Sequence, residues 1–195
     1  MKQRHAVAYC LAMIAASGSF AAPERQATES EAKTIVKTFV GEVKPMLQGY
    51  MQTRGPVGAV EGCAVDAPAI ADRVSEETGW EVGRVSLKPR NADRGTPDAW
   101  ETATLERLET KRSDGAGADE LNHGEWVDGR YRYMQAQLVE GVCLNCHGES
   151  LDPAVQAVID EYYPADSATG FSLGDIRGAV TLTSARSDAR RMNSR

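Results

Sequence analysis

Two cysteines and a histidine in the second half of the chain constrain its fold more than any other feature. Residues Cys143 to His147 read Cys-Leu-Asn-Cys-His, the spacing at which two thiols attach covalently to the two vinyl groups of one haem. The adjacent histidine is then held where its imidazole can bind the iron from the proximal side. We therefore predict one haem c per chain, attached through Cys143 and Cys146 and ligated by His147.

The position of this motif excludes the familiar cytochrome folds. In the small all-helical cytochromes c the motif lies near the start of the domain, but here more than a hundred residues precede it. In the four-helix cytochromes c-prime it lies on the last helix, but here 48 residues follow His147, and their pattern predicts a further helix and strand. A different architecture is required.

Two other chemistries use closely spaced cysteines. A thioredoxin-like redox motif opens a long helix, whereas Gly141-Val142 before the motif and Gly148-Glu149-Ser150 after it have the composition of a loop. Structural zinc needs four ligands. The candidates for such a set occur at irregular spacings; they are Cys63, Cys143, Cys146, His123 and His147. Both alternatives are less consistent with the sequence than haem attachment.

The first 21 residues have the features of a secretory signal peptide. Basic residues precede an apolar segment at 6–16, and Ser19 and Ala21 place small residues at the positions that a signal peptidase reads. We predict cleavage after Ala21, loss of Cys10 with the signal, and a soluble protein in the periplasm or another exported location. No apolar segment approaches the roughly 20 residues needed to cross a bilayer, so we expect no transmembrane segment in the mature chain.

The charge balance narrows the class of partner. Lys and Arg total 22 against 28 for Asp and Glu, a formal net charge of −6. An acidic chain does not suit a phosphate backbone, so we expect no nucleic acid as partner. A redox partner protein or a sensor partner is expected instead, and the sequence is compatible with a homodimer.

Periodicity predicts an α+β fold. Apolar residues recur every three or four positions from Thr28 to Met51, which indicates a long N-terminal helix that Pro45 should kink or divide near Gly41. A turn at residues 54–56 ends this pattern. Shorter helices are expected at 68–77, after Thr96-Pro97, and from Asp152 and Pro153 to Tyr162.

The strands alternate apolar and polar residues, which is typical of antiparallel sheets. They are expected at 80–87, with a bulge at Gly83, and at 176–183. Between them, Asp128-Gly129 joins two short strands in a tight hairpin. We predict helices flanking an antiparallel sheet in one domain over residues 22–183, followed by a polar C-terminal tail at 184–195.

Four segments in the same order carry a resemblance to a known family: residues 84–91 (RVSLKPRN), 97–101 (PDAWE), 143–148 (CLNCHG), and 163–179, which begins YPAD and ends GDIRGA. The chain resembles the PAS-like periplasmic c-type haem domain family, whose members are single-domain cytochromes or extracytoplasmic sensor modules. The resemblance runs from about Glu29 to Thr183 and departs in the link at 92–96. It implies a PAS-like antiparallel sheet with haem near it, His147 as proximal ligand, and a distal cysteine that corresponds to Cys63.

The cysteine count supports Cys63 independently. Once Cys143 and Cys146 bind haem, Cys63 has no cysteine partner, and an unpaired exported thiol persists best when it is buried or bound to metal. An inert buried cysteine is the alternative. An open iron site is another, and further candidate distal ligands are His123, Met46, Met51 and Met134.

Arginine and lysine side chains are candidates for contacts to the haem propionates, since guanidinium groups suit carboxylates. The candidates are Arg84, Lys88 and Arg90, for which a solvated basic loop is the other interpretation.

Coordination determines the expected function. An iron bound by both His147 and Cys63 is six-coordinate with an anionic ligand, which favours the ferric state and lowers the reduction potential. We therefore expect an electron carrier, with a redox or diatomic-gas sensor acting through a partner protein as the alternative. An enzyme such as a peroxidase is less consistent, because it needs an open position and a distal acid or base, for which only His123 is available.

Overall fold

The computed structural model describes residues 21–186, with side chains from residue 28 onward. Residues 1–20 of the predicted signal peptide (1–21) and residues 187–195 of the predicted tail (184–195) lie outside the described residues. The elements, in chain order, are α1 (Ala21–Thr78), β1 (Glu81–Val85), α2 (Ala92–Gly95), α3 (Ala99–Ser113), η1 (Ala118–Glu120), β2 (Asn122–Val127), β3 (Arg130–Leu138), η2 (Gly141–Cys143), α4 (Leu144–His147), α5 (Pro153–Tyr162) and β4 (Ile176–Thr183). No described helix is long and apolar enough to cross a membrane.

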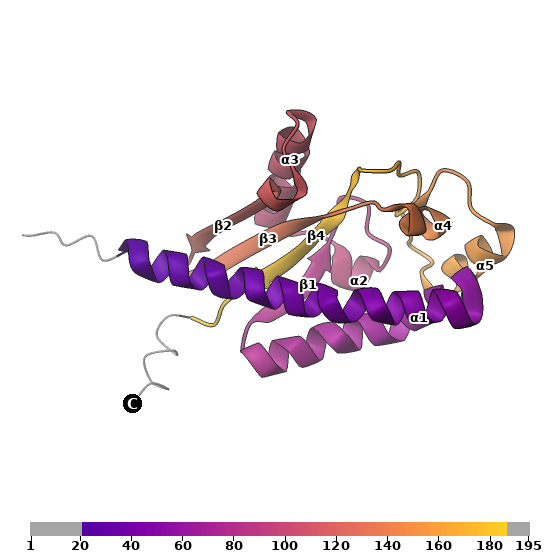
Figure 1. The fold of residues 1–195 in the computed structure, drawn as a ribbon, viewed down its shortest axis with the longest axis horizontal. Helices are drawn as coiled ribbons and strands as arrows, with labels where there is room; N and C mark the ends of the chain where they lie inside the picture. The colour runs from indigo at the N-terminus through magenta and orange to yellow at the C-terminus, as the bar shows by residue number, and fades with distance from the viewer. Residues whose placement is uncertain (1–20, 187–195) are drawn as a thin grey trace, which may run out of the picture.

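The architecture is the predicted α+β class, a four-stranded antiparallel sheet flanked by helices (Figure 1). The strand order is β1-β4-β3-β2, so the last strand of the chain lies between β1 and β3. The hairpin of β2 and β3 is confirmed: Asp128 and Gly129 have φ values of 49° and 77°, as a two-residue turn of this kind requires. The predicted bulge at Gly83 is wrong, because β1 pairs with β4 in continuous register, and the irregularity lies between Gln137 and Leu138 on β3.

The long helix α1 is divided at Gly55. This residue departs from helical geometry with φ 67° and ψ −171°, a conformation that favours glycine, and Pro56 then suits the first turn of the next helical arm. The two arms run side by side (Figure 1), with the Tyr50 hydroxyl 2.7 Å from a carboxylate oxygen of Asp66. The turn predicted at 54–56 is confirmed, whereas the division expected from Pro45 near Gly41 is wrong, because Gly55 alone breaks the helical geometry.

Both faces of the sheet are covered, because the strands alternate their side chains. On β3 and β4, Tyr131, Tyr133 and Leu182 are buried against α1, together with Phe39. The intervening positions face α3, where Met134 and Ala179 pack with Leu105. This alternation fixes the register of both strands, since a shift by one residue would exchange the two faces.

Gly178 on β4 lies where the sheet has no room for a side chain. A Cβ there would lie 2.4 Å from the carbonyl oxygen of Val85, and φ is 151°.

We expect Gly178→Ala to lower the free energy of unfolding by about 1–3 kcal/mol, because the clashing atom belongs to the backbone. Chemical denaturation measures this. In the control Gly83→Ala, the added Cβ would meet Thr181 Cγ2 at an ordinary 3.5 Å, so its stability should be unchanged or up to about 1 kcal/mol higher. Equal stability of the two variants would contradict the conclusion that the sheet has no room for a side chain at Gly178.

Candidate functional site

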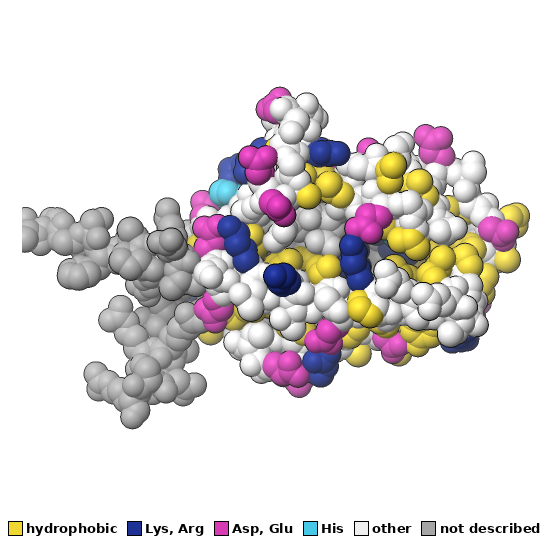
Figure 2. All heavy atoms as spheres, in the orientation of Figure 1, with side chains coloured by type: hydrophobic (Ala, Val, Ile, Leu, Met, Phe, Trp, Pro, Cys, Tyr) yellow, Lys and Arg dark blue, Asp and Glu magenta, His cyan; other side chains and the backbone are white. Residues whose placement is uncertain are grey.

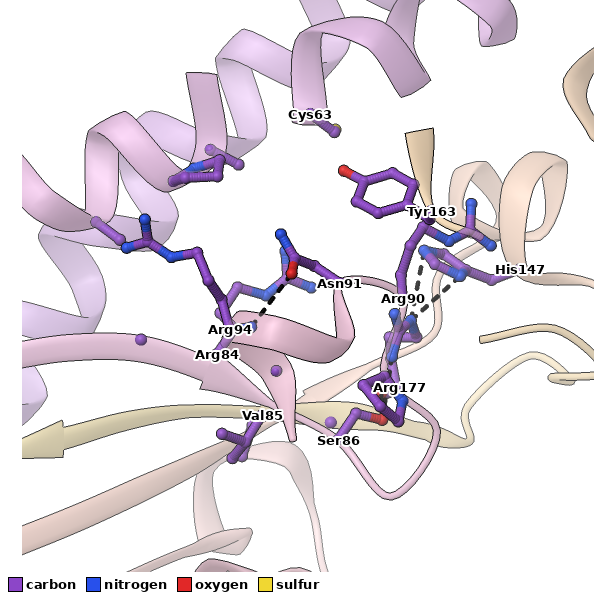
Figure 3. A pocket seen from close by; sticks show the side chains of 18 of the residues that line it. Cys63, Arg84, Val85, Ser86, Arg90, Asn91, Arg94, His147, Tyr163 and Arg177 are labelled. Carbon is purple, nitrogen blue, oxygen red and sulfur yellow. Dashed lines mark hydrogen bonds between the residues drawn. The ribbon is translucent and has the colours of Figure 1, made fainter. Parts of the chain in front are cut away.

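A cavity lies between the second arm of α1, the end of β1 with the loop after it, and the segments around α4 and α5 (Figure 3). It holds about 920 Å³ of space, counted with its opening to solvent. Residues from distant parts of the sequence meet on its wall. Those with chemically active side chains are Cys63, Arg84, Arg90, Arg94, His147, Tyr163 and Arg177.

His147 ends the short helix α4, is half-buried, and is held in a state suited to binding a metal. Its Nδ1 lies 2.7 Å from the carbonyl oxygen of Ala168. Because a carbonyl only accepts hydrogen bonds, Nδ1 carries the proton and Nε2 keeps its lone pair, the arrangement usual for histidine ligands. Burial, together with the positive charges of Arg177 and Arg90, lowers the pKa of His147 to about 2. The imidazole is therefore neutral across the physiological range.

Cys63 lies on the second arm of α1 and lines the same cavity as His147. Burial raises the pKa of its thiol, while the guanidinium groups of Arg84 and Arg90 lower it. The structure thus brings together the predicted proximal and distal residues, one a neutral imidazole and the other a half-buried thiol. Both donor types are known axial ligands of haem iron.

The two cysteines of the motif are half-buried and do not line the cavity. Cys143 packs against Val139 and Phe171, and its sulfur lies 3.3 Å from the backbone nitrogen of Glu140. Cys146 packs on a separate hydrophobic cluster between α1 and α5. Hydrophobic side chains also gather on the surface over α4 and α5 (Figure 2). Both thiols are free, and only the histidine of the motif reaches the cavity wall.

The cavity wall carries arginines and no carboxylate. Arg90 is paired with Asp166 at 3.3 Å and also contacts the carbonyl oxygens of Cys146 and Ala168, so it ties the loop after α5 to α4. Arg94 pairs with Asp72 on the exposed rim. Two guanidinium groups, those of Arg84 and Arg177, form no ion pair with any described residue. The cavity is therefore electropositive and suited to an acidic ligand.

Arg177 is the most deeply buried of these arginines, with 9% of its surface exposed. It donates hydrogen bonds to Ser86 Oγ at 3.1 Å and to the carbonyl oxygen of Lys88 at 3.2 Å, and its Nε lies 3.2 Å from His147 Nδ1 and 3.4 Å from His147 Nε2. Burial, together with the positive charges of Arg84 and Arg90, lowers the pKa of Arg177 to about 9. A buried guanidinium without a carboxylate is unfavourable, so a ligand carboxylate here would be strongly bound.

The sequence identified part of this arginine cluster. Arg84 and Arg90 line the cavity, whereas Lys88 does not: its ammonium lies 5.0 Å from the centre of the Phe171 ring and 3.4 Å from the carbonyl oxygen of Thr169. Arg177 was missed as a site residue. Its position in the sequence could have indicated it: Arg177 is the one charged residue, between Ile176 and Gly178, in a strand that is otherwise apolar on its buried faces.

The other candidate distal ligands lie away from the cavity. His123 is on β2, stacked on Trp100, with Nε2 2.7 Å from Arg107 Nη1. Met134 is buried under α3, and Met46 and Met51 lie on the first arm of α1; none lines the cavity. Among residues 21–186, no three His, Cys, Asp or Glu side chains gather into a metal site made of protein ligands alone.

The fold and this cavity define a class of protein, an α+β domain with a partly enclosed, cationic site for a cofactor or small ligand. The sequence model of the Tll0287-like family matches residues 13–185, so the chain belongs to the Tll0287-like family. A solved structure, that of the cyanobacterial heme-protein Tll0287, is similar at 23% sequence identity and a TM-score of 0.60, covering 85% of this chain and 96% of that one. No curated protein matches this chain.

Proposed function

We propose that this chain is an exported mono-haem c-type cytochrome that transfers electrons at low potential to or from a partner protein. The observation that carries the proposal is the meeting of His147 and Cys63 on one cavity, where His147 directly follows the two motif cysteines. The related cyanobacterial structure is described as a heme protein. In this proposal the PAS-like haem domain occupies residues 22–183, after removal of the signal peptide.

The residues present fit such a cofactor. Cys143 and Cys146 would hold it covalently, and the neutral imidazole of His147 would ligate its iron. Cys63 would supply the second axial ligand. The unpaired guanidinium groups of Arg84 and Arg177, together with Arg90, would bind its two carboxylates. When bound, the haem supplies a one-electron couple; the chain contributes the ligands, the charge around it and its separation from water.

The pair of axial ligands determines which chemistry the site supports. With His147 and Cys63 both binding the iron, no position would be open for a substrate, and the anionic sulfur would favour the ferric state. Electron transfer needs neither an open position nor a general acid or base. The site therefore suits a carrier better than an enzyme.

The electron paramagnetic resonance spectrum of the ferric protein tests this proposal. The protein would be matured with haem in a bacterial periplasm and purified without added ligand. A low-spin spectrum with the g values of histidine and thiolate ligation is the expected result. A high-spin spectrum would show an open position and overturn the assignment of Cys63, which would favour a gas-binding sensor instead.

A further inference from the structure

Tyr163 follows α5 and places a phenol in the cavity beside Cys63 (Figure 3). Its backbone N–H donates to the carbonyl oxygen of Ile159 at 2.8 Å, which closes the last turn of the helix. Its ring packs on the cluster that holds Val60 and Cys146. Ring and backbone are therefore both anchored, and the direction of the hydroxyl is set by the fold.

The hydroxyl of Tyr163 has no hydrogen-bond partner among the described residues. Arginines facing it, Arg90 and Arg84, are donors only and cannot accept its proton. The nearby carboxylate of Asp166 is already bound by Arg90. Cys63 lies beside the phenol on the cavity wall (Figure 3), and its sulfur forms no hydrogen bond with any described residue. Once a ligand fills the cavity and excludes water, a hydroxyl without a partner is unfavourable, so the sulfur beside it would serve as its acceptor.

We propose that the Tyr163 hydroxyl donates a hydrogen bond to the sulfur of Cys63 and thereby tunes the bond between this sulfur and the iron. The inference rests on the proposed function, in which Cys63 is the distal ligand. Iron binding leaves the sulfur as a thiolate, which is a stronger acceptor than a thiol. Tyr163 is thus a positioning and tuning residue that acts through Cys63.

The direction of the effect follows from charge. The sulfur carries more negative charge when the iron is ferrous, because ferric iron draws more electron density from it. A hydrogen bond to the sulfur is therefore stronger in the reduced protein and raises the midpoint potential, as hydrogen bonds to metal-bound sulfur do. Without the phenol, the ferric state should be more strongly favoured.

The test is Tyr163→Phe in the haem-loaded protein, with Tyr162→Phe as matched control, since Tyr162 is exposed and does not line the cavity. We expect Tyr163→Phe to shift the redox equilibrium about tenfold toward the ferric state, which corresponds to about 59 mV for a one-electron couple. The low-spin g values should change in the same variant. Tyr162→Phe should leave both unchanged.

Variants of Cys63 distinguish failure of this inference from failure of the proposed function. If Cys63→Ala leaves the ferric spectrum unchanged, the ligand assignment itself is wrong. If Cys63→Ala changes the spectrum but Tyr163→Phe alters neither potential nor g values, the hydrogen bond is refuted and the ligand assignment stands. In the Cys63→Ala background, Tyr163→Phe should no longer shift the potential; an undiminished shift there would show that Tyr163 does not act through the sulfur.

Discussion

Replacing Cys143 and Cys146 together by serine is expected to abolish covalently bound haem. Only a thiol adds to the haem vinyl groups in this attachment, and a hydroxyl of similar size does not. Haem staining of the protein on a denaturing gel, normalised to the amount of protein, measures the result directly. The signal should fall from one haem per chain to background. Either single substitution should leave at most one thioether and a reduced yield.

A third cysteine provides the control for this experiment. Cys63 is also half-buried and free, but it lies outside the motif, so Cys63→Ser should retain the stained band. The same gels probed with an antibody report whether each variant accumulates. Covalent haem that persists in the double variant would refute attachment through the motif. Loss of staining in Cys63→Ser alone would show that attachment needs Cys63 and not the two motif cysteines.

The parts of the fold that local chemistry determines could be predicted from the sequence. The turn at Asp128-Gly129 and the start of α5 at Asp152 and Pro153 depend on a few adjacent residues. The division expected at Pro45 was wrong because it, too, was predicted from adjacent residues alone. A proline inside a long helix is tolerated when packing against the sheet and the second arm holds the helix, and that packing is not visible in a local pattern.

The candidate site shows the same division. His147 and Cys63 were predicted from spacing, cysteine count and family resemblance, and the structure places both on one cavity. Arg177 and Tyr163 both fall in the family segment at 163–179, but nothing in that segment indicated that their side chains would reach the site. Their relevance arises from the burial of a guanidinium beside His147 and from the position of a phenol beside Cys63. Both depend on contacts between residues far apart in the chain.

Replacing Cys63 by alanine is expected to raise the midpoint potential by on the order of 0.2 V, a fraction of the range of about 0.8 V that axial ligands control. The anionic sulfur stabilises the ferric state, and alanine leaves that side of the iron without a protein ligand. Redox titration followed by visible absorption measures the change. The ferrous variant should also bind carbon monoxide, which the native protein with both ligands in place should bind weakly or slowly.

Cys63→Ser separates the loss of the sulfur from the loss of volume. Serine keeps a polar side chain of nearly the same size on α1, so packing is preserved while the thiolate is lost. Both variants should therefore show a raised potential and carbon monoxide binding. If only the alanine variant does so, a packing change and not ligand loss explains the effect. If neither does, Cys63 is an inert, half-buried thiol, and the distal position is open or is held by another group.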